Sequence, residues 1–201
     1  MKKLITTLFV LLSISVFSDT IKNVGGVVSK ASGTYTHLFH WSASDLGKNV
    51  TNPPVVNHYG VTKVLEMTVN TDKVSYKVSI PDEYVSGDLV LHIHWTRSGT
   101  GTDESAKTVK WQISYLVING TSENCNSGEA SESVQDVYDS AVTDEQIVYV
   151  SGDITISSGG FVAHDLVLIE IMAVTVDSGV ALANPALVSV GGTLTMYRVG
   201  S

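Results

Sequence analysis

Cysteine is nearly absent from this chain of 201 residues, which contains only Cys125. A single thiol cannot form an intrachain disulfide, so no disulfide framework holds the fold, and a metal site built on several thiolates is excluded. Acidic neighbours around Cys125 disfavour a reactive thiolate, and no Gly-x-Ser-x-Gly motif occurs. The sequence therefore offers no nucleophile for covalent catalysis, and Cys125 is interpreted as a loop residue.

Basic residues are also scarce. The chain has 12 Lys and Arg against 20 Asp and Glu, a formal net charge of -8, and only 16% charged residues. Nucleic-acid binding requires Lys and Arg in patches that contact phosphates. Nucleic acid is therefore excluded as a partner, and much of the surface is expected to be uncharged Ser, Thr, Asn and Gly.

The longest apolar run lies at the N-terminus, where Lys2 and Lys3 precede Leu4 to Phe17. Such a run is about 21 Å long as a helix, shorter than the roughly 30 Å hydrocarbon core of a bilayer. A basic start, an apolar middle and small residues before Asp19 are typical of a secretory signal peptide. We expect residues 1–18 to be a signal peptide or N-terminal hydrophobic segment, with a buried first strand or helix as the alternative reading. Residues 19–201 are then one domain, which a signal peptide would direct to secretion.

A helical period of 3.6 residues does not persist for three turns anywhere after this segment. Val, Ile and Thr dominate instead, in short alternating runs separated by turn residues. The sequence predicts an all-β fold, a single β-sandwich or jelly roll. The expected elements include a hairpin formed by Val61 to Val69 and Lys73 to Ile80, a polar loop from Asn119 to Gln135, and a strand from Leu166 to Val176 buried on both faces.

The segment from Asp88 to Thr96 is expected to be a central strand. Alternation places His92 and His94 on one face and Leu91, Ile93 and Trp95 on the other. A partner strand is predicted from Lys107 to Ile118, with Trp111, Ile113 and Tyr115 on one face. Two histidines on one strand face are either metal ligands or a polar ridge that packs in a core or an interface.

The hypothesis of a metal site rests on His92-x-His94-Trp95, which resembles the zinc-binding strand of α-type carbonic anhydrases. In that family a third histidine lies a little over twenty residues further on and completes a site with one open position. Here the matching stretch, Tyr115 to Asn119, contains no histidine. His92 and His94 remain candidate metal ligands, but the expectation is no metal, no cofactor, no catalytic residue and no enzymatic activity.

A second resemblance covers Asp88 to Ser201. It is to phage tail-fibre and head-fibre proteins, which often have His-x-His-Trp, then a Gly-rich loop, then Val-x-Trp-x-x-x-Tyr. The matching residues here are His92, His94 and Trp95, followed by Val109, Trp111 and Tyr115. The turn at Asp177, the last apolar strand and the Gly-Ser terminus resemble the same proteins. The resemblance implies a virion structural protein of fibre, spike or capsid-decoration type that exposes polar loops for attachment. Its partners would be copies of itself, a trimer being favoured, with other virion proteins and host surface glycans. The residues that it assigns to packing or subunit contacts are His92, His94, Trp95, Trp111 and Tyr115.

An apolar content of 43% supports such an assembly, because contiguous apolar strand faces usually mark a contact. We expect the contact on a sheet that contains His92, His94 and Trp111. The alternative is a secreted carbohydrate-binding β-sandwich module in which Trp41, Trp95 or Trp111 stacks on sugar rings. The module should be monomeric with an exposed tryptophan, whereas the virion protein should be oligomeric with buried tryptophans.

Overall fold

The computed structural model describes residues 23–24, 27–28, 34–48, 51–84, 86–99, 103–119, 129–140, 147–157, 159 and 161–197. The predicted leader, residues 1–18, and Cys125 lie outside these residues. In the described part of the chain no helix is long and apolar enough to cross a membrane.

Two units are distinguished along the chain. In the first, β1 (Asn23–Val24) and β2 (Val27–Val28) form a two-stranded antiparallel sheet. The second unit, Tyr35–Met196, contains two larger sheets. The expected single domain 19–201 stays a prediction, and the two units are described separately.

The first large sheet of the second unit has six strands. Its order is β10 (Ala130–Tyr138), β9 (Lys107–Ile118), β13 (Leu166–Val174), β7 (Lys73–Ser79) and β4 (Gly47–Lys48), and β14 (Val180–Ala181) also pairs with β9. Every pairing is antiparallel except that of β14 with β9.

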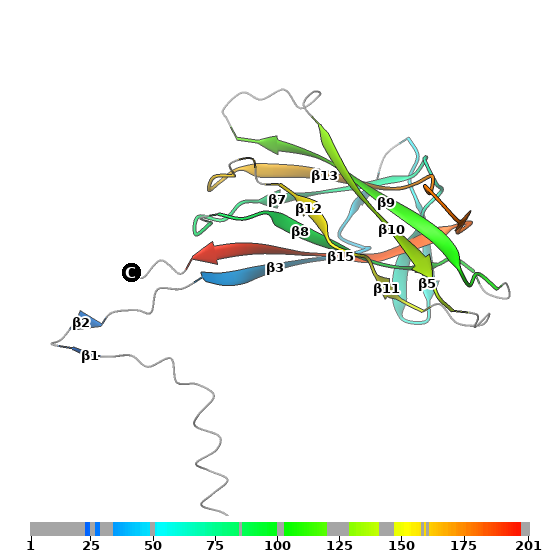
Figure 1. Ribbon diagram of the computed structural model, residues 1–201, viewed down its shortest axis with the longest axis horizontal. Coiled ribbons are helices and arrows are strands. Elements are labelled where there is room, and N and C mark those ends of the chain that lie inside the picture. Colours follow the sequence, from blue (N-terminus) through cyan, green and yellow to red (C-terminus); the bar gives the residue numbers. More distant parts are fainter. Residues whose placement is uncertain are drawn as a thin grey trace, which may run out of the picture. The chain divides into compact units, whose positions relative to one another are not determined.

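The second large sheet has seven strands, in the order β11 (Tyr149–Val150), β8 (Leu89–Arg97), β15 (Pro185–Tyr197), β6 (Thr62–Glu66) and β5 (Val55–Tyr59). In addition β12 (Ile154–Ile156) pairs with β8, and β3 (Thr34–Ser42) pairs with β15. In Figure 1, β13 and β7 lie above β8 and β15.

Apolar side chains from both large sheets fill the space between them. On β7 the alternation buries Val74, Tyr76 and Val78, and on β8 it buries Leu91, Ile93 and Trp95. These side chains belong to one hydrophobic cluster. Period-2 patterning with one face turned inward is what a sandwich of two sheets requires. The prediction of an all-β sandwich is therefore confirmed.

A register irregularity in β15 sets which of its residues face the core. The pairing with β8 shifts between Leu187 and Ser189, and both Leu187 and Val190 are fully buried although their spacing is odd. A β-bulge of this kind reverses the alternation. After it, Val190, Gly192 and Leu194 face the interior.

Several expectations about strand pairing were wrong. The strand over Lys107–Ile118 has its expected bounds, but it belongs to the sheet opposite β8 and does not pair with it. The segments β6 and β7 are likewise in different sheets, because the chain crosses between sheets at the turn around Asn70. Alternation alone fixes the faces of a strand and not its neighbours.

Two local expectations also needed correction. The predicted polar loop from Asn119 to Gln135 contains the first six residues of β10, whose N-terminal half is exposed at the sheet edge. The strand β13 is buried on only one face, since its residues alternate between buried and half-buried. Its outward face is less apolar than the run of side chains suggests, because Glu170 interrupts it.

Candidate functional site

A hollow of about 660 Å³ lies on the six-stranded sheet. The strand alternation that buries Tyr76, Ile169 and Ile113 in the core turns the residues between them outward. The hollow is therefore on the outward face of this sheet, and we call it the outer groove. The residues that line it are Trp41, Asp45, Ser75, Tyr76, Lys77, Ser114, Tyr115, Leu116, Glu129, Leu168, Ile169 and Glu170.

Cross-strand register arranges the floor of the outer groove in two rows. Leu168 on β13 lies opposite Lys77 on β7 and Leu116 on β9. One step along the strands, Glu170 lies opposite Ser75 and Ser114. Since neighbouring strands are about 4.8 Å apart, each row crosses three strands in about 10 Å. The floor thus has one mainly apolar row beside one polar row.

Two carboxylates of the outer groove, those of Glu170 and Asp45, are fixed by hydrogen bonds to neighbouring groups. Glu170 accepts a hydrogen bond from Lys73 at 2.7 Å, and both side chains are about one-third exposed. Asp45 accepts hydrogen bonds from the hydroxyl of Ser42 at 2.6 Å and from its backbone amide at 2.9 Å. These bonds lower the pKa of Asp45, which therefore stays ionised at neutral pH. Lys77 and Glu129 are exposed.

Trp41 borders one end of the outer groove together with Asp45. Its indole stacks on Phe39 with ring centroids 5.6 Å apart, and it packs against Tyr76 at 4.5 Å. The ring is half-buried, so these neighbours fix its position while part of it stays accessible. A ring held in this way presents an apolar surface at little cost in side-chain entropy.

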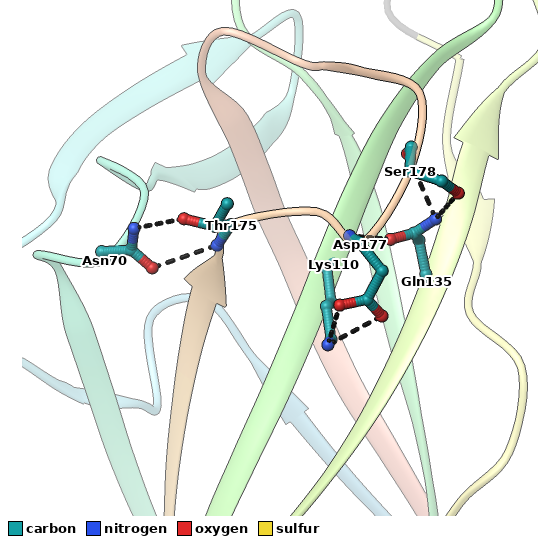
Figure 2. A network of polar contacts seen from close by, with 6 residues as sticks. All are labelled: Asn70, Lys110, Gln135, Thr175, Asp177 and Ser178. Carbon is teal, nitrogen blue, oxygen red and sulfur yellow. Dashed lines mark hydrogen bonds and ion pairs between the residues drawn. The ribbon is translucent and has the colours of Figure 1, made fainter.

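Figure 2 shows a network of polar contacts where the chain leaves β13, around Thr175, Asp177 and Ser178. Lys110 donates to both carboxylate oxygens of Asp177, at 2.7 and 2.9 Å, and Gln135 accepts from the backbone amide of Asp177 at 2.7 Å. Nearer β7, Asn70 exchanges two hydrogen bonds with Thr175. This network ties the β13–β14 connection to β9 and β10.

The two predicted histidines lie on the outward face of the other sheet. His92 and His94 are half-buried on β8, and Leu91, Ile93 and Trp95 are fully buried on its other side, as the alternation predicted. The Nδ1 atom of His92 is 3.4 Å from Oδ1 of Asp153, and the rings of His94 and His40 are 6.4 Å apart. Burial, and then the charges of His40 and His92, lower the pKa of His94.

Among the residues that the structure describes, no three His, Cys, Asp or Glu side chains are placed to hold a metal ion.

Of the other predicted contact residues, Trp95 lies on the opposite face of β8, and Trp111 and Tyr115 lie in the other sheet. Trp95 and Trp111 are fully buried and come from different sheets, so the expected contact sheet containing His92, His94 and Trp111 does not exist. Burial also removes Trp95 and Trp111 as surfaces for sugar rings, which leaves Trp41 of the three tryptophans. Tyr115 is half-buried, and its pKa is raised by burial and by the charges of Glu132 and Asp88.

Reasoning from the sequence did not find the outer groove. One signal was available: Glu170 is the single charged residue within the apolar run of β13. A carboxylate in such a run indicates which face of the strand points outward. It also indicates that a polar side chain is used on that face. Its neighbours Ser75 and Ser114 could not be assigned without the register.

No protein-family model matches the sequence, and no curated protein matches it. Distant likenesses occur among solved structures. A xylan-binding module (CBM15) is 12% identical, with a TM-score of 0.45, over 80% of this chain and 97% of that one. A family 35 carbohydrate-binding module from Clostridium thermocellum is also 12% identical, with a TM-score of 0.39, over 78% of this chain and 97% of that one.

An exo-β-1,3-galactanase from Phanerochaete chrysosporium is 10% identical with a TM-score of 0.42. The match covers 85% of this chain but only 32% of the galactanase, so the chain corresponds to about a third of that protein. At these identities and TM-scores the likenesses carry no conclusion about function.

Proposed function

We propose that this chain is a glycan-binding β-sandwich module whose ligand lies in the outer groove. The observation that carries the proposal is the pairing of an apolar row with a polar row across three strands, bordered by Trp41. A sugar ring has an apolar face of C–H groups and an edge of hydroxyls, so it requires both kinds of surface side by side. The volume of about 660 Å³ lies within the usual range of ligand sites, about 300–1,000 Å³.

Each group in the outer groove has a role in this proposal. Leu116 and Leu168 contact the apolar faces of the sugar rings, and Trp41 stacks on a ring at the end of the groove. Glu170 accepts hydrogen bonds from sugar hydroxyls, and charged acceptors form stronger bonds than neutral ones. Carboxylates outnumber ammonium groups along the groove, which favours neutral over acidic glycans.

The carboxylates of the outer groove come from different segments of the chain. Glu170 lies two strands from Glu129, and it is likewise separated from Asp45 by β7. We propose that the chain binds glycans and does not hydrolyse them.

An array of immobilised neutral and acidic oligosaccharides tests the proposal. The protein at neutral pH should be retained by one or more neutral glycans, and retention should be lost in Glu170→Ala. Substituting Glu129→Gln keeps the size of the side chain and should weaken retention less, because Glu129 is at the exposed border. No retention on any glycan would contradict the proposal.

The hypothesis of a phage fibre, spike or decoration protein stays a prediction. It is compatible with glycan binding, since attachment to a host surface glycan would use the same groove. It differs in requiring a homo-oligomer, with a trimer favoured, and association with other virion proteins. Sedimentation of the purified chain separates a monomeric module from the assembled form.

A further inference from the structure

Tyr76 carries a buried hydroxyl that the described part of the chain does not use. The residue is only 9% exposed, and its hydroxyl oxygen has no hydrogen-bond partner among the described residues. Burial raises the pKa of Tyr76 and is the only cause of that rise, so no hydrogen bond or nearby charge acts on the group. Most buried polar groups in native proteins are hydrogen-bonded, and an exception often marks a functional group.

Tyr76 lies where the outer groove meets Trp41. It is one of the residues that line the groove, and its ring packs against the indole of Trp41 with centroids 4.5 Å apart. On β7, β4 pairs with Val74 and Ser75 only, so from Tyr76 onward this side of β7 has no paired strand within the described residues. Tyr76 is therefore at an open edge of the sheet, and the indole that borders the groove is its direct neighbour.

The contacts of Trp41 allow its indole to shift by a small distance. They include the stack on Phe39 and the contact with Tyr76, and such packing is non-directional. Its strand, β3, pairs with β15 alone within the described residues, so it is also an edge strand. A shift by the width of one hydroxyl group would open the Tyr76 hydroxyl to the outer groove and leave the indole at the border.

We propose that the Tyr76 hydroxyl donates a hydrogen bond to the glycan in the outer groove and selects a sugar with a hydroxyl at the matching position. The inference rests on the proposed function, and the acceptor is a hydroxyl oxygen of the sugar ring that stacks on Trp41. This bond offsets the desolvation of a group that the ligand-free chain leaves unpaired. A sugar without that hydroxyl would leave Tyr76 unpaired in the complex, and sites built to bond a hydroxyl reject such analogues.

Tyr76→Phe should change stability and binding in opposite directions. Phenylalanine keeps the ring that packs against Trp41 and removes only the hydroxyl. Because an unpaired buried hydroxyl is destabilising, the variant should melt about 2–4 °C higher than the wild type. The protein concentration that gives half-maximal retention on the array of neutral oligosaccharides should rise about tenfold, since one hydrogen bond to the glycan is lost.

The matched control is Tyr84→Phe. Tyr84 is also 9% exposed, but its hydroxyl donates a hydrogen bond to the backbone oxygen of Gly87 at 2.7 Å. Tyr84 is not among the described residues that line the outer groove. The same substitution should therefore lower the melting temperature at this position and leave retention on the array unchanged.

Monodeoxy analogues of the retained oligosaccharide identify the contact. The wild-type chain should bind one analogue about tenfold more weakly than the parent oligosaccharide. Tyr76→Phe should bind that analogue and the parent equally, because the hydroxyl that distinguishes them is gone.

Three results would overturn the assignment of Tyr76. A melting temperature of Tyr76→Phe at or below that of the wild type would mean that the hydroxyl has a partner in the ligand-free chain. Equal retention of Tyr76→Phe and the wild type would contradict the hydrogen bond and leave the proposed function standing. No retention of the wild type on any glycan would contradict the proposed function itself, and the role of Tyr76 would fall with it.

Discussion

Two adjacent glycines in β15 should respond oppositely to the same substitution. Gly192 faces the core, where a Cβ would lie 2.8 Å from Cδ2 of Leu91. Gly191 faces outward, and its nearest neighbour would be 3.7 Å away, an ordinary contact. Neither glycine is among those with a positive φ. The difference between Gly192→Ala and Gly191→Ala therefore comes from packing and not from backbone strain.

The magnitude follows from two opposing contributions. An extra methyl group in a well-packed core costs about 1–3 kcal/mol, and replacing glycine by alanine in a strand returns about 0.5–1 kcal/mol. Gly192→Ala should therefore reduce the free energy of unfolding by up to about 2.5 kcal/mol. For a domain of this size that lowers the melting temperature by up to about 10 °C. Gly191→Ala should leave stability unchanged or raise it by up to about 1 kcal/mol.

Urea denaturation followed by circular dichroism measures both variants against the wild type. Adding Leu91→Val to Gly192→Ala removes one of the clashing methyl groups, so the double variant should lose less than the sum of the two single losses. Equal destabilisation by Gly191→Ala and Gly192→Ala would refute the reasoning. A one-residue slip in β15 would exchange the faces of the two glycines, so that Gly191→Ala would be the destabilising variant.

Three further predictions concern stability. Oε1 of Glu66 accepts hydrogen bonds from Tyr59, Asn57 and Ser98, which outweigh the effect of burial and lower the pKa of Glu66. The stabilisation that ionised Glu66 supplies is fully present above its ordinary pKa of 4.5. It is lost as the pH falls through the lowered pKa of the folded chain. Glu66→Gln should therefore cost about 1–3 kcal/mol at pH 7 and flatten the acid side of the stability curve, which thermal melts across pH would show. Trp111→Ala should lower the free energy of unfolding by about 3–5 kcal/mol, because it leaves a cavity in the core. If Trp111 packs within one chain and not between chains, this loss should be the same at every protein concentration. Asp177→Asn breaks an exposed ion pair with Lys110 and should cost no more than about 1 kcal/mol, while hydrogen exchange of the β13–β14 connection increases.

The sequence was most informative where burial imposes a strict period. The faces of β8 were predictable because Leu91, Ile93 and Trp95 alternate with the histidines, and the bounds of β9 followed from the same pattern. Pairing was not predictable, since β8 and β9 follow one another in the chain and yet enter different sheets. Short-range periodicity carries no information on which strands become neighbours.

The candidate site was harder to predict for the same reason. Ser75, Ser114 and Glu170 are far apart in sequence, and each is unremarkable within its own strand. They form a row only through the registers of β7, β13 and β9. Trp41 could be proposed as a sugar-stacking residue from its type, but Trp95 and Trp111 were equal candidates until burial separated them.

The most direct test of glycan binding is the affinity of Trp41→Ala for an oligosaccharide that the array has identified. Leu38→Ala is the matched control, because Leu38 is 74% exposed on the other face of the same strand. Isothermal titration calorimetry at pH 7.5 should show that Trp41→Ala weakens binding at least about thirtyfold, the effect of losing about 2 kcal/mol, and that Leu38→Ala binds as the wild type does. Unchanged affinity in folded Trp41→Ala, or an equal loss in Leu38→Ala, would contradict the assignment of the outer groove.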